Sequence, residues 1–309
     1  MITRLAVAGV LSSLATFPAH ALNTRTWISG HGTDQASCGA VTSPCRTLQY
    51  AHDNTAAGGE IDVLDPAGYG SLVITKSINI INEGVGVAGI LASPGGNGVT
   101  INAGANDVVV LRGLAIEGAR VGANGVVFNS GGQLTISNCL VQNFAGNNST
   151  AGNGILVQHA SGKPEILIKD TTTSNNGYVG LFHSSVVGAR LSVDRVTASH
   201  NAYGVVVGMS AVVAITNSYA SNNSATGVQV YRQGPGPFVD DVLLESVQSI
   251  NNHINVEGVG GPTMRMSRVT TRGPYYDLYC DVTCTIQSYR DNVFRENWGN
   301  FTSVTVSHF

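Results

Sequence analysis

Four charged side chains from the middle of the chain onward could carry out chemistry on a polymer that bears carboxylate groups. They are Lys169, Asp194, Glu245 and Arg265. Two carboxyl groups about 6.5–9.5 Å apart can hydrolyse a glycosidic bond with inversion, because a water molecule fits between the base and the sugar. Lysine and arginine can bind carboxylates, or one of them can act as the base that removes a proton next to a carboxylate. Which chemistry applies depends on the elements that position the four residues.

These elements belong to a repeat. Within residues 121–272, five segments each begin at a glycine, alternate between apolar and other residues, and close on an asparagine. The segments begin at Gly125, Gly154, Gly180, Gly204 and Gly227, and they close at Asn143, Asn175, Asn201, Asn222 and Asn251. A repeat of this length with period-2 alternation predicts a solenoid in which each segment forms one coil. Three short strands per coil, separated by corners rich in Gly and Asn, indicate an all-β parallel β-helix.

Stacking the coils predicts the direction of each side chain. The inward residues of the first coil are expected to be Val126, Phe128, Leu134, Ile136, Cys139 and Val141, with copies in later coils. The outward column beside the second strand reads Ser137, Lys169, Asp194, Thr216, Glu245 and Ser267. Asp194 and Glu245 then stand two coils apart, with Cα atoms about 10 Å from each other. Lys169 lies beside Asp194, and Arg265 lies one coil from Glu245. The closing asparagines are expected to take left-handed backbone and to hydrogen-bond from coil to coil.

An alternative interpretation of the charged column is structural. Opposite charges in neighbouring rungs usually form exposed salt bridges worth less than about 1 kcal/mol. Arg195 and Arg268 fall on corners and are expected to point into solvent. His183 takes an inward position, where a buried and satisfied histidine is expected, whereas His159 and His200 fall on corners.

A second outward column is apolar. It contains Val127, Leu156, Phe182 and Val206, and such a stripe is uncommon on the surface of a monomer. Either a long corner loop, such as residues 145–153 or 233–239, covers it, or it is a face for self-association. If the stripe is exposed, Phe182 together with Tyr203 and Tyr231 would form a stacking platform for sugar rings.

The N-terminal segment predicts export. Residues 1–21 contain a positive charge at Arg4, an apolar run and the sequence Ala19-His20-Ala21, which is typical of a cleaved signal peptide. We therefore expect a secreted or periplasmic protein. No other long apolar run is present, so no membrane span is expected.

Composition and cysteines narrow the function classes. Only 11% of residues are charged and the net charge is −3, which disfavours a nucleic-acid partner.

Cys38 with Cys45, and Cys280 with Cys284, are expected to form local disulfides, as suits an exported protein. Metal binding is the rival for these pairs, but neither pair has a second pair at ligand spacing. Cys139 is expected to be a buried free thiol. No cofactor is expected, and Ca²⁺ stays open without a clear cluster of Asp residues.

Residues 44–81 carry a family resemblance. The sequence PCRTLQYAHDNTAAGGEIDVLDPAGYGSLVITKSINI resembles the entry of pectate-lyase-like right-handed β-helix proteins. The resemblance implies a short cap helix over residues 47–54, a first strand over 59–64 and a turn at 68–70, and it extends over most of residues 44–298. The implied organisation is a signal peptide (1–21), an N-terminal cap with the disulfide loop (22–58), the β-helix (59–298) and a C-terminal capping strand (299–309).

The catalytic motifs of the known groups within this superfamily do not match. Polygalacturonase-type hydrolases carry N-T-D, D-D, G-H-G and R-I-K in that order, whereas this chain has Asp240-Asp241 and an earlier Gly30-His31-Gly32 in the wrong order. The motifs of pectin esterases, alginate epimerases and the main pectate lyases are absent as well. Two classes therefore stay open. One is an exported lyase or glycoside hydrolase acting on acidic polysaccharide. The other is a non-catalytic surface or adhesion module that binds glycans or partners.

Overall fold

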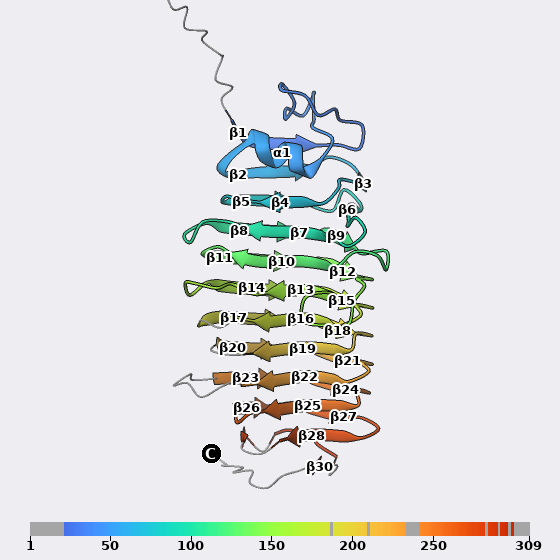
Figure 1. Ribbon diagram of the computed structural model, residues 1–309, viewed down its shortest axis with the longest axis vertical. Coiled ribbons are helices and arrows are strands. Elements are labelled where there is room, and N and C mark those ends of the chain that lie inside the picture. Colours follow the sequence, from blue (N-terminus) through green and yellow to red (C-terminus); the bar gives the residue numbers. More distant parts are fainter. Residues whose placement is uncertain are drawn as a thin grey trace, which may run out of the picture.

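The chain folds into a three-sided column of stacked coils (Figure 1). The computed structural model describes residues 22–185, 188–208, 211–232, 241–281, 284–289, 291–295 and 298–299. Each coil contributes one strand to each of three sheets, and every strand pairs in parallel with its copy in the next coil. The predicted all-β, right-handed parallel β-helix with three short strands per coil is confirmed.

The strands of each sheet follow one another at intervals of one coil. The eleven-stranded sheet contains β1 (Asn23–Ile28), β2 (Thr55–Val63), β5 (Ile78–Ile81), β8 (Val108–Arg112), β11 (Gln133–Ser137), β14 (Glu165–Lys169), β17 (Ala189–Asp194), β20 (Ala211–Thr216), β23 (Asp241–Glu245), β26 (Thr263–Ser267) and β29 (Thr285–Ser288). The ten-stranded sheet contains β4 (Leu72–Ile74), β7 (Asn97–Asn102), β10 (Asn124–Ser130), β13 (Asn153–Val157), β16 (Val179–Ser184), β19 (Tyr203–Gly208), β22 (Thr226–Tyr231), β25 (Ile254–Val259), β28 (Tyr276–Cys280) and β30 (Trp298–Gly299). The nine-stranded sheet contains β3 (Ala67–Gly68), β6 (Ala88–Leu91), β9 (Leu114–Glu117), β12 (Leu140–Gln142), β15 (Thr172–Ser174), β18 (Thr197–Ser199), β21 (Tyr219–Ser221), β24 (Gln248–Ile250) and β27 (Thr270–Arg272).

The core fills the inside of the column. The predicted inward residues are all buried, and they form one continuous cluster that runs through the coils, from Ile28 to Ile286. Val126, Ile136 and Val141, one from each sheet of the same coil, have no exposed surface. Alternation with period 2 therefore placed these columns correctly, because in-register parallel pairing sets each residue against its copy.

Two rows of corner residues take the left-handed backbone that the sequence predicted for asparagines. The first row follows the strands of the eleven-stranded sheet and consists of Asn138, Asp170, Arg195, Asn217, Ser246 and Arg268. The second row follows the strands of the nine-stranded sheet and consists of Asn143, Asn175, His200, Asn222 and Asn251. Asn201 is absent from the second row, so its predicted place there is wrong. His200 occupies that corner, and Asn201 is the next residue, which is buried.

The N-terminal end of the column is closed by a short helix. Helix α1 (Leu48–Asn54) buries Leu48 and Ala51, and the Thr47 hydroxyl accepts a hydrogen bond of 3.3 Å from the Tyr50 N–H. Because α1 begins after this N-cap, the predicted cap helix over 47–54 agrees with the structure to within one residue. The strands start earlier than expected, since β1 precedes α1 and pairs with β2, which begins at Thr55 rather than at residue 59.

The cysteines are paired as predicted. Cys38 is bonded to Cys45 and Cys280 to Cys284, while Cys139 is a buried free thiol whose pKa is raised to about 11, chiefly by burial. The predicted signal peptide lies outside the described residues, and so do residues 300–309 of the predicted capping strand. Among the helices that the structure describes, none is long and apolar enough to cross a membrane.

Candidate functional site

The predicted charged column exists with the predicted register. Lys169 pairs with Asp194, Asp194 with Thr216, Thr216 with Glu245, and Glu245 with Ser267 in successive strands. Asp194 and Glu245 therefore stand two strands apart, which is about 10 Å between Cα atoms. The backbone fulfils the geometric requirement from which the catalytic hypothesis started, and the surroundings of each side chain decide what the column can do.

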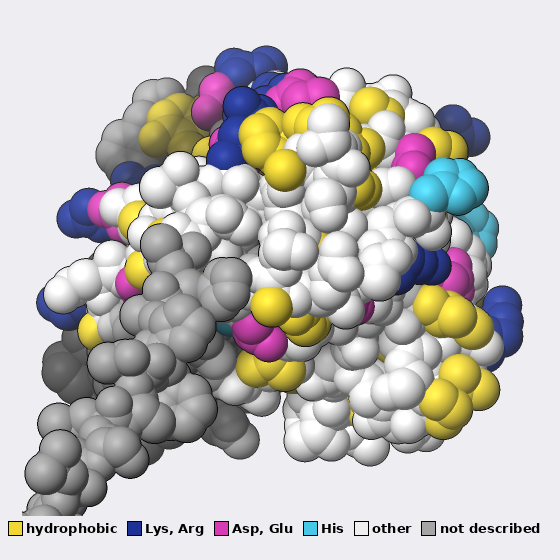
Figure 2. All heavy atoms as spheres, turned by 90° about the horizontal axis from the view of Figure 1, so that it is seen from above, with side chains coloured by type: hydrophobic (Ala, Val, Ile, Leu, Met, Phe, Trp, Pro, Cys, Tyr) yellow, Lys and Arg dark blue, Asp and Glu magenta, His cyan; other side chains and the backbone are white. Residues whose placement is uncertain are grey.

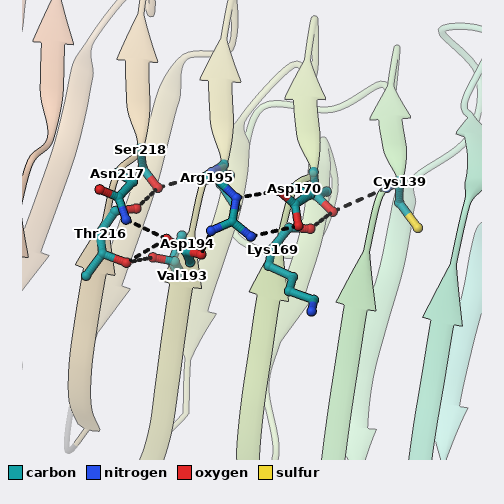
Figure 3. A network of polar contacts seen from close by, with 11 residues as sticks. Cys139, Lys169, Asp170, Val193, Asp194, Arg195, Thr216, Asn217 and Ser218 are labelled. Carbon is teal, nitrogen blue, oxygen red and sulfur yellow. Dashed lines mark hydrogen bonds and ion pairs between the residues drawn. The ribbon is translucent and has the colours of Figure 1, made fainter.

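Asp194 is held in a network of hydrogen bonds and ion pairs (Figure 3). Its carboxylate accepts hydrogen bonds of 2.9 Å from the Thr216 hydroxyl and 2.9 Å from the Asn217 amide, and it contacts the Arg195 guanidinium. The Asn217 hydrogen bond is the main reason why the pKa of Asp194 is lowered; burial opposes it, and the Thr216 hydrogen bond and the Arg195 charge lower the pKa further. A general acid in a glycosidase needs a raised pKa. The surroundings of Asp194 therefore favour an ionised carboxylate rather than a proton donor.

Arg195 links two coils. Its Nε and Nη2 atoms donate hydrogen bonds of 2.6 Å and 2.9 Å to the Asp170 carboxylate, while its Nη1 atom contacts Asp194. Glu245 is paired in the same manner with Arg268, whose Nε atom also donates a hydrogen bond of 3.0 Å to the Ser246 hydroxyl. The two arginines were expected to point into solvent, and they are half exposed but paired. This arrangement fits the structural interpretation, in which the charges of the column form salt bridges, although the arginines that form them were expected to be solvated.

The structure separates the two predicted basic residues. Arg265 lies on β26, in register with Leu243 on β23 and Gln287 on β29. Lys169 lies on β14, four strands away and about 19 Å along the column. Lys169 also points away from Asp194 and Arg195 (Figure 3). Lys169, Asp194, Glu245 and Arg265 therefore do not surround one point, and their catalytic roles stay predictions.

Lys169 instead lines a hollow with a residue that sequence reasoning missed. Arg112, Ser137, Asn138, Lys169 and Asp170 surround this hollow, which we call the basic hollow. Arg112 occupies the charged column two strands before Lys169, because Arg112 pairs with Ser137 and Ser137 with Lys169. Extending the register into the sequence VVVLR would have found it.

The two cations of the basic hollow differ in their direct partners. Arg112 forms one exposed ion pair, 3.3 Å from Glu83. Asp170 is already occupied by Arg195, whose hydrogen bond is the main reason why the pKa of Asp170 is lowered. Within the described chain, the Lys169 ammonium makes no hydrogen bond or ion pair. Two basic groups about 10 Å apart therefore face the hollow, and the Lys169 ammonium has no direct hydrogen bond that a bound anion would have to displace.

The outward apolar stripe is buried. Val127, Leu156, Phe182 and Val206 are at most 4% exposed, and with Val179 they form a second apolar cluster. Tyr178, Tyr203 and Tyr231 pack against this cluster and are partly buried. The prediction that Phe182 offers an exposed ring for stacking on sugars is wrong, because the ring is covered on its outward side. The stripe also presents no exposed apolar face of the kind that self-association would need.

Tyr203 and Tyr231 keep some exposed surface at the edge of the buried cluster. Burial raises the pKa of both hydroxyls. Contact with sugar stays a prediction for these two residues. Residues 233–239, one of the two loops predicted to cover the stripe, lie outside the described residues.

Charges elsewhere on the column are mixed. Seen from the N-terminal end, basic and acidic side chains alternate around the rim without a large patch of one sign (Figure 2). Among the described residues, no three His, Cys, Asp or Glu side chains come together to hold a metal ion.

Comparisons with known proteins agree on the fold. Residues 97–273 match the family model described as "Right handed beta helix region". A crystal structure of pectate lyase Pel9A superposes with a TM-score of 0.60 at 14% identity, covering 92% of this chain and 80% of the other. The A-module of the mannuronan C-5 epimerase AlgE4 from Azotobacter vinelandii gives a TM-score of 0.40 at 16% identity, covering 81% of this chain and 91% of the other. No curated protein matches the sequence. At 14% identity the pectate lyase structure establishes a similar fold, and the residues of the site must be judged from this chain alone.

Proposed function

This chain belongs to the right-handed β-helix family, and from that premise we propose that it binds acidic polysaccharide through the basic hollow. The observation that carries the proposal is the Lys169 ammonium, which lines a hollow and makes no hydrogen bond or ion pair within the described chain. Arg112 supplies a second cation, and Ser137 and Asn138 offer polar groups for sugar hydroxyls. A carboxylate on a sugar could accept hydrogen bonds from the Lys169 ammonium.

Export is part of the same proposal. Two disulfides support a location outside the cytoplasm, where such bonds form and persist. Residues 1–21 have the composition of a signal peptide. Acidic polysaccharides are components of cell walls and extracellular matrices, so the location and the ligand are consistent with each other.

Binding is favoured over hydrolysis because of the ion pairs. Asp194 and Glu245 are each paired with an arginine, and the pKa of Asp194 is lowered rather than raised. A hydrolase would need one of the two carboxyl groups to keep its proton near neutral pH. The second candidate function is a lyase that uses Lys169 as its base, which the unpaired position of this lysine favours.

A binding experiment with matched variants tests the proposal. Wild type, Lys169→Gln and Lys163→Gln are titrated with polygalacturonate, alginate and neutral dextran, and the dissociation constants are measured by calorimetry. Lys163 is exposed and lies outside the hollow, so the control removes the same charge elsewhere. We expect Lys169→Gln to weaken binding of the acidic polymers about tenfold or more, and Lys163→Gln to have little effect. Equal effects of the two substitutions, or no binding of acidic polymers, would contradict the proposal.

An activity assay separates the two candidate functions. The same polymers are incubated with and without Ca²⁺, and the ultraviolet absorbance of unsaturated sugars and the release of reducing ends are followed. Unsaturated product that survives Asp194→Asn and Glu245→Gln but disappears in Lys169→Gln would establish a lyase. Reducing ends without that absorbance, lost in Asp194→Asn and Glu245→Gln, would restore the hydrolase hypothesis. Binding without any product supports the non-catalytic module.

A further inference from the structure

A second hollow lies at another corner of the column. Its lining includes Arg120, Asn175, Gly177, His200, Asn222 and Ser224, and we call it the corner hollow. Asn175, His200 and Asn222 are successive members of the second row of left-handed corner residues, with φ angles of 56°, 57° and 54°. All three side chains are exposed. Arg120 comes from the corner two coils earlier and also has a left-handed backbone, with φ of 59°.

The Arg120 guanidinium is the uncommitted charged group of the corner hollow. Within the described chain, the Arg120 side chain makes no hydrogen bond or ion pair. The carboxylate in the same corner, Glu117, is occupied, since it accepts hydrogen bonds from the Ala119 N–H at 2.8 Å, the Gln142 amide at 3.0 Å and the Asn143 amide at 3.1 Å. A permanent guanidinium charge therefore faces a hollow that also offers an imidazole and carboxamide groups. This set of groups suits an anionic oxygen ligand.

The corner hollow and the basic hollow lie at opposite ends of the same short strands. On β15, Asp170 of the basic hollow precedes the strand and Asn175 of the corner hollow follows it. Asn175 follows Asp170 by five positions, so the Cα atoms of these two residues are at most about 17 Å apart. The nine-stranded sheet, along the right-hand edge of Figure 1, forms the surface between them.

The outer face of β15 and β18, between the two hollows, bears hydroxyl groups. The half-buried side chains of Thr172, Thr197 and Ser199 lie on the outer face of β15 and β18, while the intervening Thr173 and Ala198 point into the core. Short hydroxyl side chains leave room for a ligand to lie across the strands. They can exchange hydrogen bonds with sugar hydroxyls, directly or through water.

We propose that the corner hollow is a second anion subsite, and that one acidic polysaccharide chain crosses the nine-stranded sheet with an anionic group in each hollow. This inference rests on the proposed function and adds to it the direction of the bound chain and a minimum ligand length. The ligand chemistry common to both hollows is a carboxylate or an ester sulfate on a sugar polymer. Joining two weak subsites through one polymer raises the overall affinity, because the second contact is intramolecular.

Ligand length provides the test. Wild type, Arg120→Gln, Lys169→Gln and Arg272→Gln are titrated with uronate oligomers that are shorter and longer than the span of about 17 Å between the hollows. Arg272 is an exposed arginine at the far end of the same sheet, and it makes no side-chain hydrogen bond or ion pair among the described residues. Sulfated oligomers of the same lengths form a parallel arm that distinguishes carboxylate from sulfate as the preferred group.

The expected result is a length-dependent loss. Arg120→Gln should weaken the binding of long oligomers about tenfold and leave the binding of short ones unchanged. Lys169→Gln should weaken the binding of both. Arg272→Gln should change neither. If Arg120→Gln binds long oligomers as tightly as wild type, the second subsite is overturned. The proposed function would still be supported if Lys169→Gln weakens binding. Failure of wild type to bind any acidic oligomer would overturn both. Circular dichroism of each variant establishes that the substitutions leave the fold intact.

Discussion

At the residue scale, His183 is a histidine inside an apolar column. It is fully buried at a position that holds Val157 and Val207 in the neighbouring coils. Its Nδ1 atom lies 2.8 Å from the Gly208 carbonyl oxygen, which can only accept, so Nδ1 carries the hydrogen and donates. The Nε2 atom is buried without a partner in the structure. The expectation of a buried histidine is confirmed, and that of a satisfied one holds for only one of its two nitrogens.

The surroundings of His183 disfavour a positive charge. Its ring centroid lies 5.9 Å from that of His159, which is buried as well. Burial is the main reason why the pKa of His183 is lowered to about 4. Sequence reasoning placed His159 at a corner, but its burial could not be read from its position in the repeat.

We predict that His183 makes the folded state less stable as the pH falls from about 6.5 to about 4. In this range the unfolded histidine binds a proton and the folded one does not, so protons favour unfolding. The effect amounts to about 2 kcal/mol between pH 7 and pH 5. The pKa values of Asp194 and Asp170 are lowered, so their contribution to the stability of the folded state is lost only as the pH falls below the ordinary pKa of aspartate. This is a separate, more acidic range than that of His183.

Urea unfolding at pH 7 and pH 5 measures this effect in wild type and in His183→Val, which places in the column the residue that already occupies position 207. On acidification, the free energy of unfolding of the variant should fall by about 2 kcal/mol less than that of wild type. His31→Gln, which removes an exposed histidine, serves as the control. An unchanged pH dependence in His183→Val would contradict the prediction.

At the element scale, the coils are joined by a ladder of buried asparagines next to the corners. The Asn201 amide and backbone N–H donate to the Asn223 side-chain oxygen, and Asn223 donates in the same way to Asn252. The glycine that begins each repeat makes room for the ladder. A Cβ atom on Gly204 would lie 2.8 Å from the Asn223 amide nitrogen and 2.5 Å from the Gly227 carbonyl oxygen. Gly204, which begins a repeat, and Asn223, the buried asparagine after the next corner, are therefore packing partners.

We predict that Asn223→Ala lowers the free energy of unfolding by about 3 kcal/mol. The substitution leaves the donors of Asn201 without the side-chain oxygen that they contact and removes the amide hydrogen bond to the Ala198 carbonyl. The Asn252 side-chain oxygen loses one of its two donors and keeps the backbone N–H of residue 223. Asn222→Gly is the matched control, because Asn222 is exposed and its left-handed backbone suits glycine. Urea unfolding should show a change of no more than about 0.5 kcal/mol for the control. If both variants unfold alike, the ladder does not stabilise the coils.

At the scale of the whole molecule, a solenoid depends on contacts between neighbouring coils, and its ends need protection. Helix α1 and the loop closed by Cys38–Cys45 lie at the N-terminal end. The Cys45 N–H donates to the Trp27 carbonyl at 2.9 Å, and the Ser29 N–H donates to the Cys45 carbonyl at 3.0 Å. These hydrogen bonds connect the disulfide-closed loop directly to β1, the first strand of the eleven-stranded sheet.

We predict that the double variant Cys38→Ala/Cys45→Ala loses about 2 kcal/mol of stability, because closing this short loop no longer restricts the unfolded chain. Since each coil contacts only its neighbours, the loss should be concentrated at one end. Hydrogen exchange should show reduced protection in β1 and β2 and unchanged protection in β22. Uniform loss of protection along the column would indicate that the coils unfold as one unit.

The sequence by itself determined the coils, the register of the strands and the inward columns. In-register parallel stacking places every residue beside its copy, so repeat length and period-2 alternation are sufficient to align Lys169, Asp194 and Glu245. Only the tertiary structure decided how the outward residues behave. The left-handed corners bring Arg195 and Arg268 onto the predicted carboxylates, and the Phe182 ring is covered despite its outward position. These outcomes depend on side-chain directions and on contacts between coils and corners, which a column of residue types does not contain.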